Sequence, residues 1–407
     1  MKLVKLFLKK NIQKKSFTNA AQNQRRCNPA LTLCFLCAIP FLTGAQGAFS
    51  GGGSAGPSYF DLGAQKTENL ASFSAANRIW GGGIQSVIEE AYRDCFKTKI
   101  IAGRVMTIRT PFAENHERDS LVEEGWDFLD KGKGGPGSLW PAIERALASD
   151  DFEAYTKMLN DGREKVVIFD IPERKWSVST DIFDIARIKA GSYHGLPHKP
   201  YVLSSGKGAS QNDVYNYLYC ISWTGMDCSA FVWHVLSYTA KAAGRNLEKE
   251  LRKALGAPSG TKAAWYAGTA FYNSKSKEII PVNDSIRSLR PADIILFRSK
   301  DGSMAHSAII QSIDFNKGVI RYLQNTDEAP QESRGVHESY IYFKNTHPAA
   351  RLTDPSLKWS QMRYSPFPGE RESAFSDDGE RYRAYGGGRV VRLRAFAQIS
   401  SALNSQK

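Results

Sequence analysis

One helix-forming stretch followed by strand-forming runs constrains the fold of this chain most. Residues 229–243 place apolar side chains mostly on one side of a helix, and Gly244 is suited to ending it. Four runs typical of strands follow, at residues 293–297, 307–313, 319–323 and 339–343. This order predicts an α+β fold in which a helix packs on an antiparallel sheet.

The region from 65 to 199 has a mixed pattern. Apolar residues recur at helical spacing over 84–96 and 139–159, whereas 100–108 and 165–169 have the composition of strands. We therefore predict an N-terminal α+β region, to which the sequence assigns no chemistry.

The first 47 residues run from basic to apolar to small. Eight Lys or Arg accompany a 13-residue apolar run at 30–42, which contains Pro40 and is short for a membrane of ~30 Å. This order predicts a secretory signal over 1–47, followed by a flexible glycine-rich linker over 48–64. The expected location is outside the cytoplasm, in the periplasm or cell envelope.

Without this leader, which has no acidic residue, the net charge of +13 becomes +5. A mild positive charge suits an anionic surface such as a cell wall and does not call for nucleic acid. The segment 351–407 is predicted to be a basic C-terminal extension, either a solvated tail or a terminal strand, with an arm that contacts the wall as the alternative.

Three cysteines remain after the leader: Cys95, Cys220 and Cys228. They can form at most one internal disulfide, so at least one thiol stays free or pairs elsewhere. Cys228 is the candidate for the free thiol.

Cys228 lies where a reactive thiolate could form. Asp227 is in the position of an N-cap, and Cys228 falls in the first turn of the predicted helix. The unpaired amides of that turn would stabilise a thiolate, which is the form that attacks a carbonyl.

His306 follows Cys228 by 78 positions and opens a predicted strand. If that strand runs beside the helix start, the imidazole can accept the thiol proton and return it to a leaving amine. A third polar group would fix the histidine tautomer, and the candidates are Gln324, Asn325 and His337.

The plainer interpretation is that both residues are structural. A lone cysteine on an amphipathic helix is most often a small buried hydrophobe, and a lone histidine beside an apolar strand is most often a satisfied core or surface residue.

Three motifs, in order, resemble the NlpC/P60 family of cell-wall peptidases. Gly-Met-Asp-Cys-Ser-Ala-Phe-Val at 225–232 is similar to the family's nucleophile motif. Pro-Ala-Asp-Ile at 291–294 resembles its Pro-Gly-Asp-Leu strand, and His-Ser-Ala-Ile-Ile at 306–310 resembles its His-Val-Gly-Ile strand. The resemblance covers a domain placed at 200–350.

This resemblance implies a papain-like core, with Cys228 as nucleophile and His306 as base. It places the third catalytic residue at the end of the next strand, where Gln324 is expected, with Asn325 as the near alternative. Residues around the nucleophile are expected to bind substrate, namely Asp227, Ser229, and Tyr217 or Tyr219 in place of the family's pocket tyrosine.

The sequence departs from the family in several places. Ala230 and Ala292 replace usual glycines, which we expect to be a mild change, and the upstream Tyr-x-Trp-Gly-Gly segment is not recognisable. The long gap between Cys228 and His306 predicts an insertion at about 245–285.

The expected function is that of an exported cysteine peptidase. By family implication it hydrolyses a γ-D-glutamyl to diamino-acid bond in peptidoglycan stem peptides, with no cofactor. His194 and His198 are four residues apart, but neighbouring glycine and prolines argue against a metal site. The alternatives are an inactive wall-binding or scaffolding protein of the same fold and a papain-like amidase or acyltransferase, and a cell-envelope protein partner stays open.

Overall fold

The computed structural model describes residues 75–113, 136–170, 173–189, 201–222, 224–326, 335–343, 349–364, 371–375 and 378–397. The predicted leader, the linker and the pair His194 and His198 lie outside these residues. Helices and antiparallel sheets occur together in the described part, which confirms the predicted α+β class.

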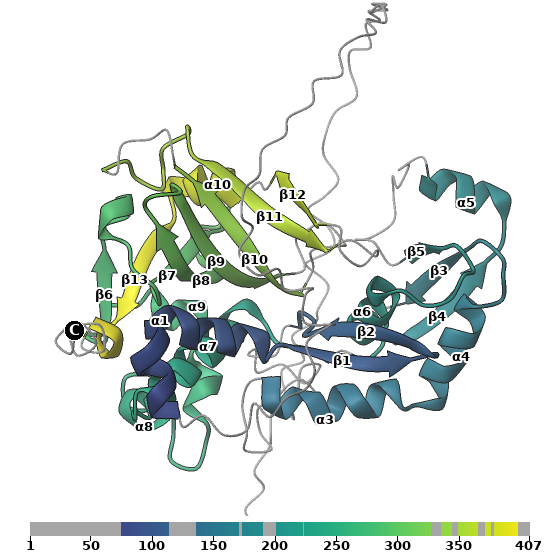
Figure 1. Cartoon of the computed structure of the whole chain (residues 1–407), viewed down its shortest axis with the longest axis horizontal. Helices are drawn as coiled ribbons and strands as arrows, with labels where there is room; N and C mark the ends of the chain where they lie inside the picture. Colours follow the sequence, from purple (N-terminus) through teal and green to yellow (C-terminus); the bar gives the residue numbers. More distant parts are fainter. Residues whose placement is uncertain are drawn as a thin grey trace, which may run out of the picture. The chain divides into compact units, whose positions relative to one another are not determined.

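The main sheet has eight strands in the order β12-β11-β10-β9-β8-β7-β13-β6 (Figure 1). Their bounds are β6 Ile279–Val282, β7 Ile294–Arg298, β8 Met304–Asp314, β9 Val319–Thr326, β10 Gly335–Tyr342, β11 Lys358–Tyr364, β12 Arg371–Phe375 and β13 Arg389–Leu393. Consecutive strands from β7 to β12 pair antiparallel, so the predicted meander is confirmed and continues through β12.

Helices cover both faces of this sheet. They are α1 Ala75–Arg93, α7 Cys228–Ala242, α8 Leu247–Leu251, α9 Thr269–Tyr272 and α10 Asp378–Arg383, with 3₁₀ turns η4 Ala263–Tyr266, η5 Ile286–Ser288 and η7 Ala384–Gly386. α7 matches the predicted helix within one residue at each end.

Side chains alternate between two cores along the central strands. Ile309 and Leu323 belong to the core that contains residues of α1 and α7, and we call this side of the sheet the helix face. Ala308 and Ile310 belong to a second core with Trp359 and with Tyr382 of α10, which we call the far face. α1 and α7 therefore lie on one side of the sheet and α10 on the other (Figure 1).

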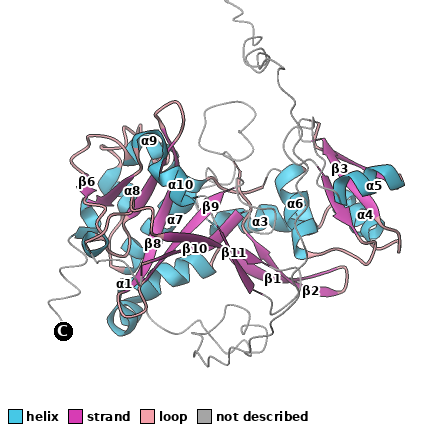
Figure 2. Ribbon diagram, turned by 90° about the horizontal axis from the view of Figure 1, so that it is seen from above, coloured by secondary structure: helices cyan, strands magenta, loops and turns pink. Residues whose placement is uncertain are grey.

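The N-terminal region contains two smaller sheets. β1 Phe96–Ile101 pairs with β2 Arg104–Arg109, and β3 Lys165–Asp170 lies between β4 Lys175–Ser179 and β5 Tyr201–Ser204. The helices are α3 Pro136–Leu147, α4 Asp150–Leu159, α5 Ile182–Lys189 and α6 Gln211–Cys220. α4 and α5 lie beside β3 (Figure 2).

Two predicted elements in this region are each divided in two. The strand predicted over 100–108 turns back at Ala102 and Gly103, both with positive φ, and forms the β1–β2 hairpin. The helix predicted over 139–159 breaks before Ser149, whose side chain accepts the amide of Phe152 and so caps α4. In both cases the spacing of apolar residues suits one continuous element, and the prediction missed the turn that divides it.

The sheets cross the boundaries predicted at 200 and 350. β5 pairs with β3 across the first, and β11, β12 and β13 extend the main sheet beyond the second. The helix-face core also contains Trp140 and Val167. Three strands of the main sheet thus lie in the region predicted as a C-terminal extension.

β13 is held in the sheet by a buried ion pair as well as by backbone bonds. The guanidinium of Arg392 donates to both carboxylate oxygens of Asp293, at 2.6 and 2.8 Å. Asp293 is fully buried, and burial raises the pKa of its carboxyl despite the nearby Arg392 cation. The last strand therefore neutralises the aspartate that precedes β7.

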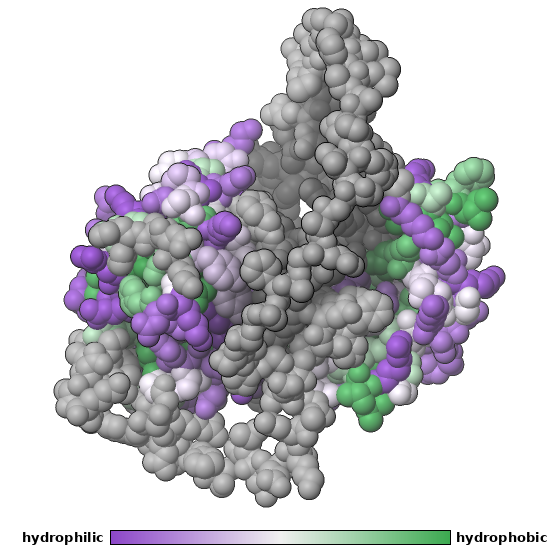
Figure 3. Space-filling model, turned by 45° about the horizontal axis from the view of Figure 1, so that its top comes forward, coloured by the Kyte–Doolittle hydropathy of each residue, from purple (hydrophilic) through white to green (hydrophobic). Residues whose placement is uncertain are grey.

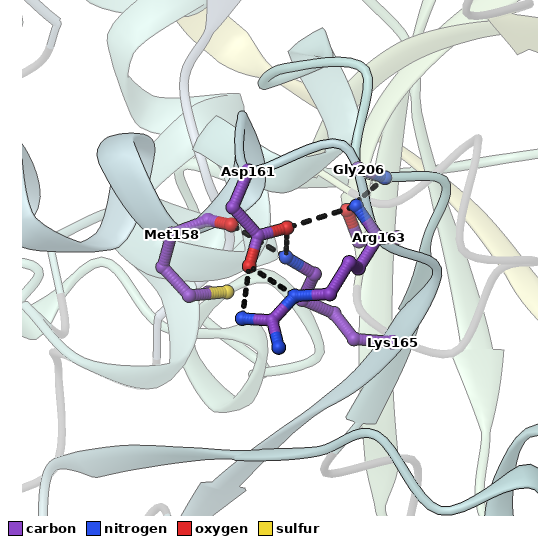
Figure 4. A network of polar contacts seen from close by, with 6 residues as sticks. Met158, Asp161, Arg163, Lys165 and Gly206 are labelled. Atoms are coloured by element: carbon purple, nitrogen blue, oxygen red, sulfur yellow. Dashed lines mark hydrogen bonds and ion pairs between the residues drawn. The ribbon is translucent and has the colours of Figure 1, made fainter.

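A second buried cation fixes the turn between α4 and β3. The ammonium group of Lys165, which is fully buried, donates to the carbonyl of Met158 at 2.7 Å and pairs with Asp161 (Figure 4). Arg163 also pairs with Asp161, at 2.9 Å. This network joins the end of α4 to the start of β3.

Apolar side chains reach the surface at two places in the N-terminal region. Ile100 and Val105 are partners on the β1–β2 hairpin, and Ile182 and Phe183 lie on α5. On the right-hand side of Figure 3, hydrophobic residues (green) are exposed among hydrophilic ones (purple). Within the described ranges, no helix combines the length and apolarity that crossing a membrane requires.

Candidate active site

Cys228 opens α7 directly after its cap. Asp227 is the N-cap, as predicted, and its Oδ1 accepts the backbone N–H of Ala230 at 2.6 Å and the hydroxyl of Ser229 at 2.9 Å. Asp227 and Ser229 are both almost fully buried, so these contacts shape the helix start. Cys228 itself is 7% exposed, close to amides that carry a share of the helix dipole.

The chain before Cys228 is fixed by close backbone contact with residues 111–113. The N–H of Met226 donates to the carbonyl of Pro111 at 3.1 Å, and the N–H of Ala113 donates to the carbonyl of Met226 at 3.0 Å. A Cβ on Gly225 would lie 2.5 Å from the carbonyl oxygen of Pro111. The glycine of the nucleophile motif is therefore required by this approach.

Asn325 contacts the same segment from the sheet. Its Nδ2 donates to the carbonyl of Met226 at 2.7 Å and to that of Pro111 at 3.4 Å, so its Oδ1 is free to accept. Oδ1 is buried and has no hydrogen-bond partner among the described residues. An unused acceptor thus lies near the start of α7.

His306 and Gln324 are in contact, as the sequence predicted. His306 Nε2 lies 2.7 Å from Gln324 Oε1, while Gln324 Nε2 donates to Ser339 Oγ and to Asp378 Oδ2, each at 2.9 Å. These acceptors fix the orientation of the amide. His306 must then donate through Nε2, which leaves the lone pair of a neutral ring on Nδ1.

Asp378 anchors this group, which we call the His306 network. Its Oδ2 accepts from the hydroxyl of Tyr322 at 2.6 Å and from Nε2 of Gln361 at 3.2 Å, in addition to Gln324. Burial raises the pKa of the carboxyl, but the bonds from Tyr322 and Gln324 outweigh it and hold that pKa below its usual value.

The network keeps its histidines neutral. Burial, reinforced by the cation of Arg381, lowers the pKa of His306 to about 4. Burial also lowers the pKa of His337 to about 4, and its Nδ1 donates to the carbonyl of Gly335 at 2.9 Å. Both imidazole rings are therefore uncharged at neutral pH.

The register places His306 on the far face of the sheet. His306 lies opposite Phe297, and Gln324 lies opposite Ala308, both of which belong to the far-face core. Cys228 begins α7, which packs on the helix face. The register thus directs the His306 side chain to the face opposite the one on which α7 packs, which differs from the side-by-side arrangement that the sequence predicted.

A β-bulge beside His306 is the physical reason. Phe297 lies opposite His306, but the next pair is Arg298 with Met304, so Ala305 is an extra residue. Met304 belongs to the helix-face core. In a regular strand residues two apart lie on the same face, so without the bulge His306 would share the helix face with Met304. Sequence alone does not reveal a bulge of this kind.

The two predicted pocket tyrosines have other roles in the fold. The hydroxyl of Tyr217 donates to Asp151 at 2.7 Å, and its ring packs edge to face on Phe152 of α4. Tyr219 stacks on Tyr215. These contacts assign Tyr217 to the packing of α6 against α4 and give no support to a role in the substrate pocket.

The nearby residues that sequence reasoning missed are Asp378 and Tyr272. Asp378 belongs to an acidic pair within a basic segment, a weak signal that was available. Tyr272 belongs to an aromatic cluster of the predicted insertion, with Trp265, Tyr266 and Phe271, whose composition favours packing of the insertion and leaves the rim of a groove as the alternative.

Ala292 departs from the family pattern at a strained position. It is fully buried and has φ 72, a left-handed conformation that favours glycine. The change from glycine was expected to be mild, but the structure shows that the side chain is held where a Cβ is disfavoured.

Cys95, Cys220 and Cys228 are all buried, and no disulfide joins any of them to another described cysteine. Among the residues that the structure describes, no cluster of three or more histidine, cysteine or acidic side chains could hold a metal ion. Comparison with protein-family models, curated proteins and solved structures gives no match for this chain.

Proposed function

We propose that this chain is an exported cysteine hydrolase of the NlpC/P60 type, with a papain-like core and Cys228 as its nucleophile. Its substrate would be an amide bond in peptidoglycan stem peptides, of the γ-D-glutamyl to diamino-acid kind. The observation that carries the proposal is the position of Cys228 in the first turn of the capped helix α7, packed on an antiparallel sheet.

The chemistry follows from that position. The thiolate attacks the substrate carbonyl, and backbone amides at the start of α7 hold the oxyanion. A neutral imidazole takes the thiol proton and delivers it to the leaving amine, after which water releases the acyl group. His306 is the base that the family resemblance implies, and in its far-face position burial keeps its ring neutral at neutral pH.

Catalysis by this pair requires His306 to move to the helix face. If the bulge shifted from Ala305 to Ser307, His306 would change face while Ala308 kept its place. Ser307 Oγ is buried without a partner in the described residues, so no bond of its side chain opposes the shift. We propose that the contact with Gln324 is the resting state and that Asn325 receives His306 in the active state.

Thiol alkylation and wall digestion test the function together. Wild type, Cys228→Ala and the matched control Cys220→Ala would be compared for release of free amino groups from purified peptidoglycan. We expect Cys228→Ala alone to abolish release, and Cys228 to be alkylated well below the reference thiol pKa of ~8.5. Equal digestion by wild type and Cys228→Ala would refute the proposal.

A second candidate is a wall-binding protein without turnover. The placement of His306 on the far face favours it, because the base is not beside the thiol. Such a protein would sediment with insoluble peptidoglycan, with and without Cys228, and release no amino groups. Product analysis also separates peptidase from amidase or acyl transfer, since only the peptidase frees the amino terminus of the diamino acid.

Export is a separate part of the proposal and has its own test. If residues 1–47 are a cleaved signal, the mature protein recovered from the envelope begins near residue 48. A protein that retains Met1 in the cytoplasm would contradict export and leave the chemistry of Cys228 untouched.

A further inference from the structure

Tyr272 is a buried tyrosine whose hydroxyl is not used by the fold. It is the last residue of α9, within the segment predicted as an insertion, and its side chain is fully buried in the helix-face core. The hydroxyl has no hydrogen-bond partner among the residues that the structure describes. Because burying an unbonded hydroxyl destabilises a fold, its presence calls for a partner that binds.

The hydroxyl lies close to the start of α7. Burial raises the pKa of Tyr272 far above its usual value, and the negative charges of Asp227 and Cys228 raise it further. These interactions require proximity to the cap and to the thiol. At neutral pH Tyr272 therefore stays protonated and can donate a hydrogen bond beside Cys228.

Asn325 supplies an independent second observation at the same helix start. Its Nδ2 is occupied by the carbonyls of Met226 and Pro111, and its buried Oδ1 is an unused acceptor. A donor and an acceptor, both buried and both unused, thus lie near the end of α7 that Cys228 opens. A secondary amide presents the complementary groups, a carbonyl oxygen and an N–H.

We propose that Tyr272 is a substrate-binding residue of the Cys228 site, which donates a hydrogen bond to the carbonyl oxygen of a bound peptide-type amide. Asn325 Oδ1 accepts from the amide N–H. This assignment rests on the proposed function and gives its site two contacts from outside the nucleophile motif. It also gives the insertion a role, because α9 brings Tyr272 to the site.

Tyr272→Phe is the test, because it removes one hydroxyl and keeps the ring. Tyr155→Phe is the matched control: Tyr155 is as deeply buried, and its hydroxyl donates to the carbonyl of Asp213 at 3.2 Å in another part of the core. Each variant would be measured for kcat/KM on stem peptides, for the rate of Cys228 alkylation by iodoacetamide, and for melting temperature.

We expect Tyr272→Phe to lower kcat/KM by about 10- to 100-fold, which is less than the roughly 100- to 1,000-fold loss known for a donor to the oxyanion itself. Its melting temperature should not fall, whereas Tyr155→Phe should melt lower and keep kcat/KM within about twofold. If Tyr272 had only a structural role, Tyr272→Phe would lower the melting temperature and leave kcat/KM unchanged. A Tyr272→Phe enzyme with kcat/KM within about twofold of wild type would overturn the inference.

The two proposals fail differently. If wild type releases nothing from the wall, the hydrolase proposal fails, and iodoacetamide, which carries an amide itself, still probes the site. Tyr272→Phe should then slow alkylation of Cys228 at least about threefold, and an unchanged rate would refute the role of Tyr272 on its own.

Discussion

His306 donates through Nε2 to Oε1 of Gln324, 2.7 Å away, on the face of the sheet that α7 does not cover. This contact sets the tautomer that a general base needs and directs the ring away from Cys228. The resting position of His306 is therefore stabilised by a buried network anchored on Asp378.

Gln324→Met should raise the rate of stem-peptide hydrolysis per folded molecule. The substitution removes the bond that holds His306 on the far face and leaves its Nε2 without a partner there, which disfavours that face by about 1–3 kcal/mol. Initial rates normalised to titratable Cys228 would measure it. Gln361→Met is the control, since Gln361 also donates to Asp378 but does not touch His306. Loss of turnover in a folded Gln324→Met protein would instead place Gln324 in the catalytic machinery.

Gly225→Ala should destabilise the fold and change the reactivity of the Cys228 thiol. The added Cβ would lie 2.5 Å from the carbonyl oxygen of Pro111, so the backbone before Cys228 must move, at a cost of about 1–3 kcal/mol. Urea unfolding and the alkylation rate of Cys228 would both report the change. Gly244→Ala is the comparison, because its Cβ meets nothing within 4 Å and only its positive φ opposes it. An unchanged alkylation rate in Gly225→Ala would contradict this account.

Ala292→Gly should stabilise the protein. Ala292 has φ 72, and relief of a left-handed conformation gains about 1 kcal/mol, less the loss of a buried methyl group. We expect a small rise in the urea midpoint with an unchanged slope. Ala308→Gly, in the middle of β8, should show the opposite sign, and a loss of stability in Ala292→Gly would mean that the methyl contributes more than the strain costs.

Stability should fall between pH 6.5 and pH 4. Burial lowers the pKa of His234, His306 and His337 to about 4 in the folded chain, against ~6.5 when unfolded. Over this window the unfolded state binds more protons, so the stabilisation is complete above pH 6.5 and is lost as the pH falls towards 4.

The loss is at most roughly 3 kcal/mol per histidine, and the raised pKa values of buried Asp213 and Asp293 oppose part of it. Urea unfolding from pH 7 to pH 4.5 measures the slope. His337→Asn should reduce the slope by removing one of these titrations. A flat profile would show that the rings are accessible to protons in the folded state.

Periodicity and capping predicted the centre of the fold well. The helix at 229–243 and four strands of the meander lie within a few residues of α7, β7, β8, β9 and β10, because a one-sided apolar pattern leaves few ways to bury those side chains. The break at Ser149 and the turn at Ala102 were missed, since each interrupts a run whose composition suits one element.

The candidate site was predictable in composition and not in arrangement. Asp227 and Cys228 follow from local rules of helix capping, and Gln324 was correctly placed next to His306. The face that His306 occupies depends on one extra residue, Ala305, and a one-residue shift exchanges the two faces of a strand. Asp378 and Tyr272 come from segments far along the chain, and only tertiary structure brings them near.

β13 is the penultimate strand in spatial order and the last in synthesis. It lies between β7 and β6, and its Arg392 neutralises the buried carboxylate of Asp293. A chain that has emerged only as far as residue 380 leaves β7 with an open edge and an unpaired buried acid. The eight-stranded sheet therefore closes around β7 only after residues 389–393 have been made, so its central strands depend on a segment almost 100 residues further along the chain.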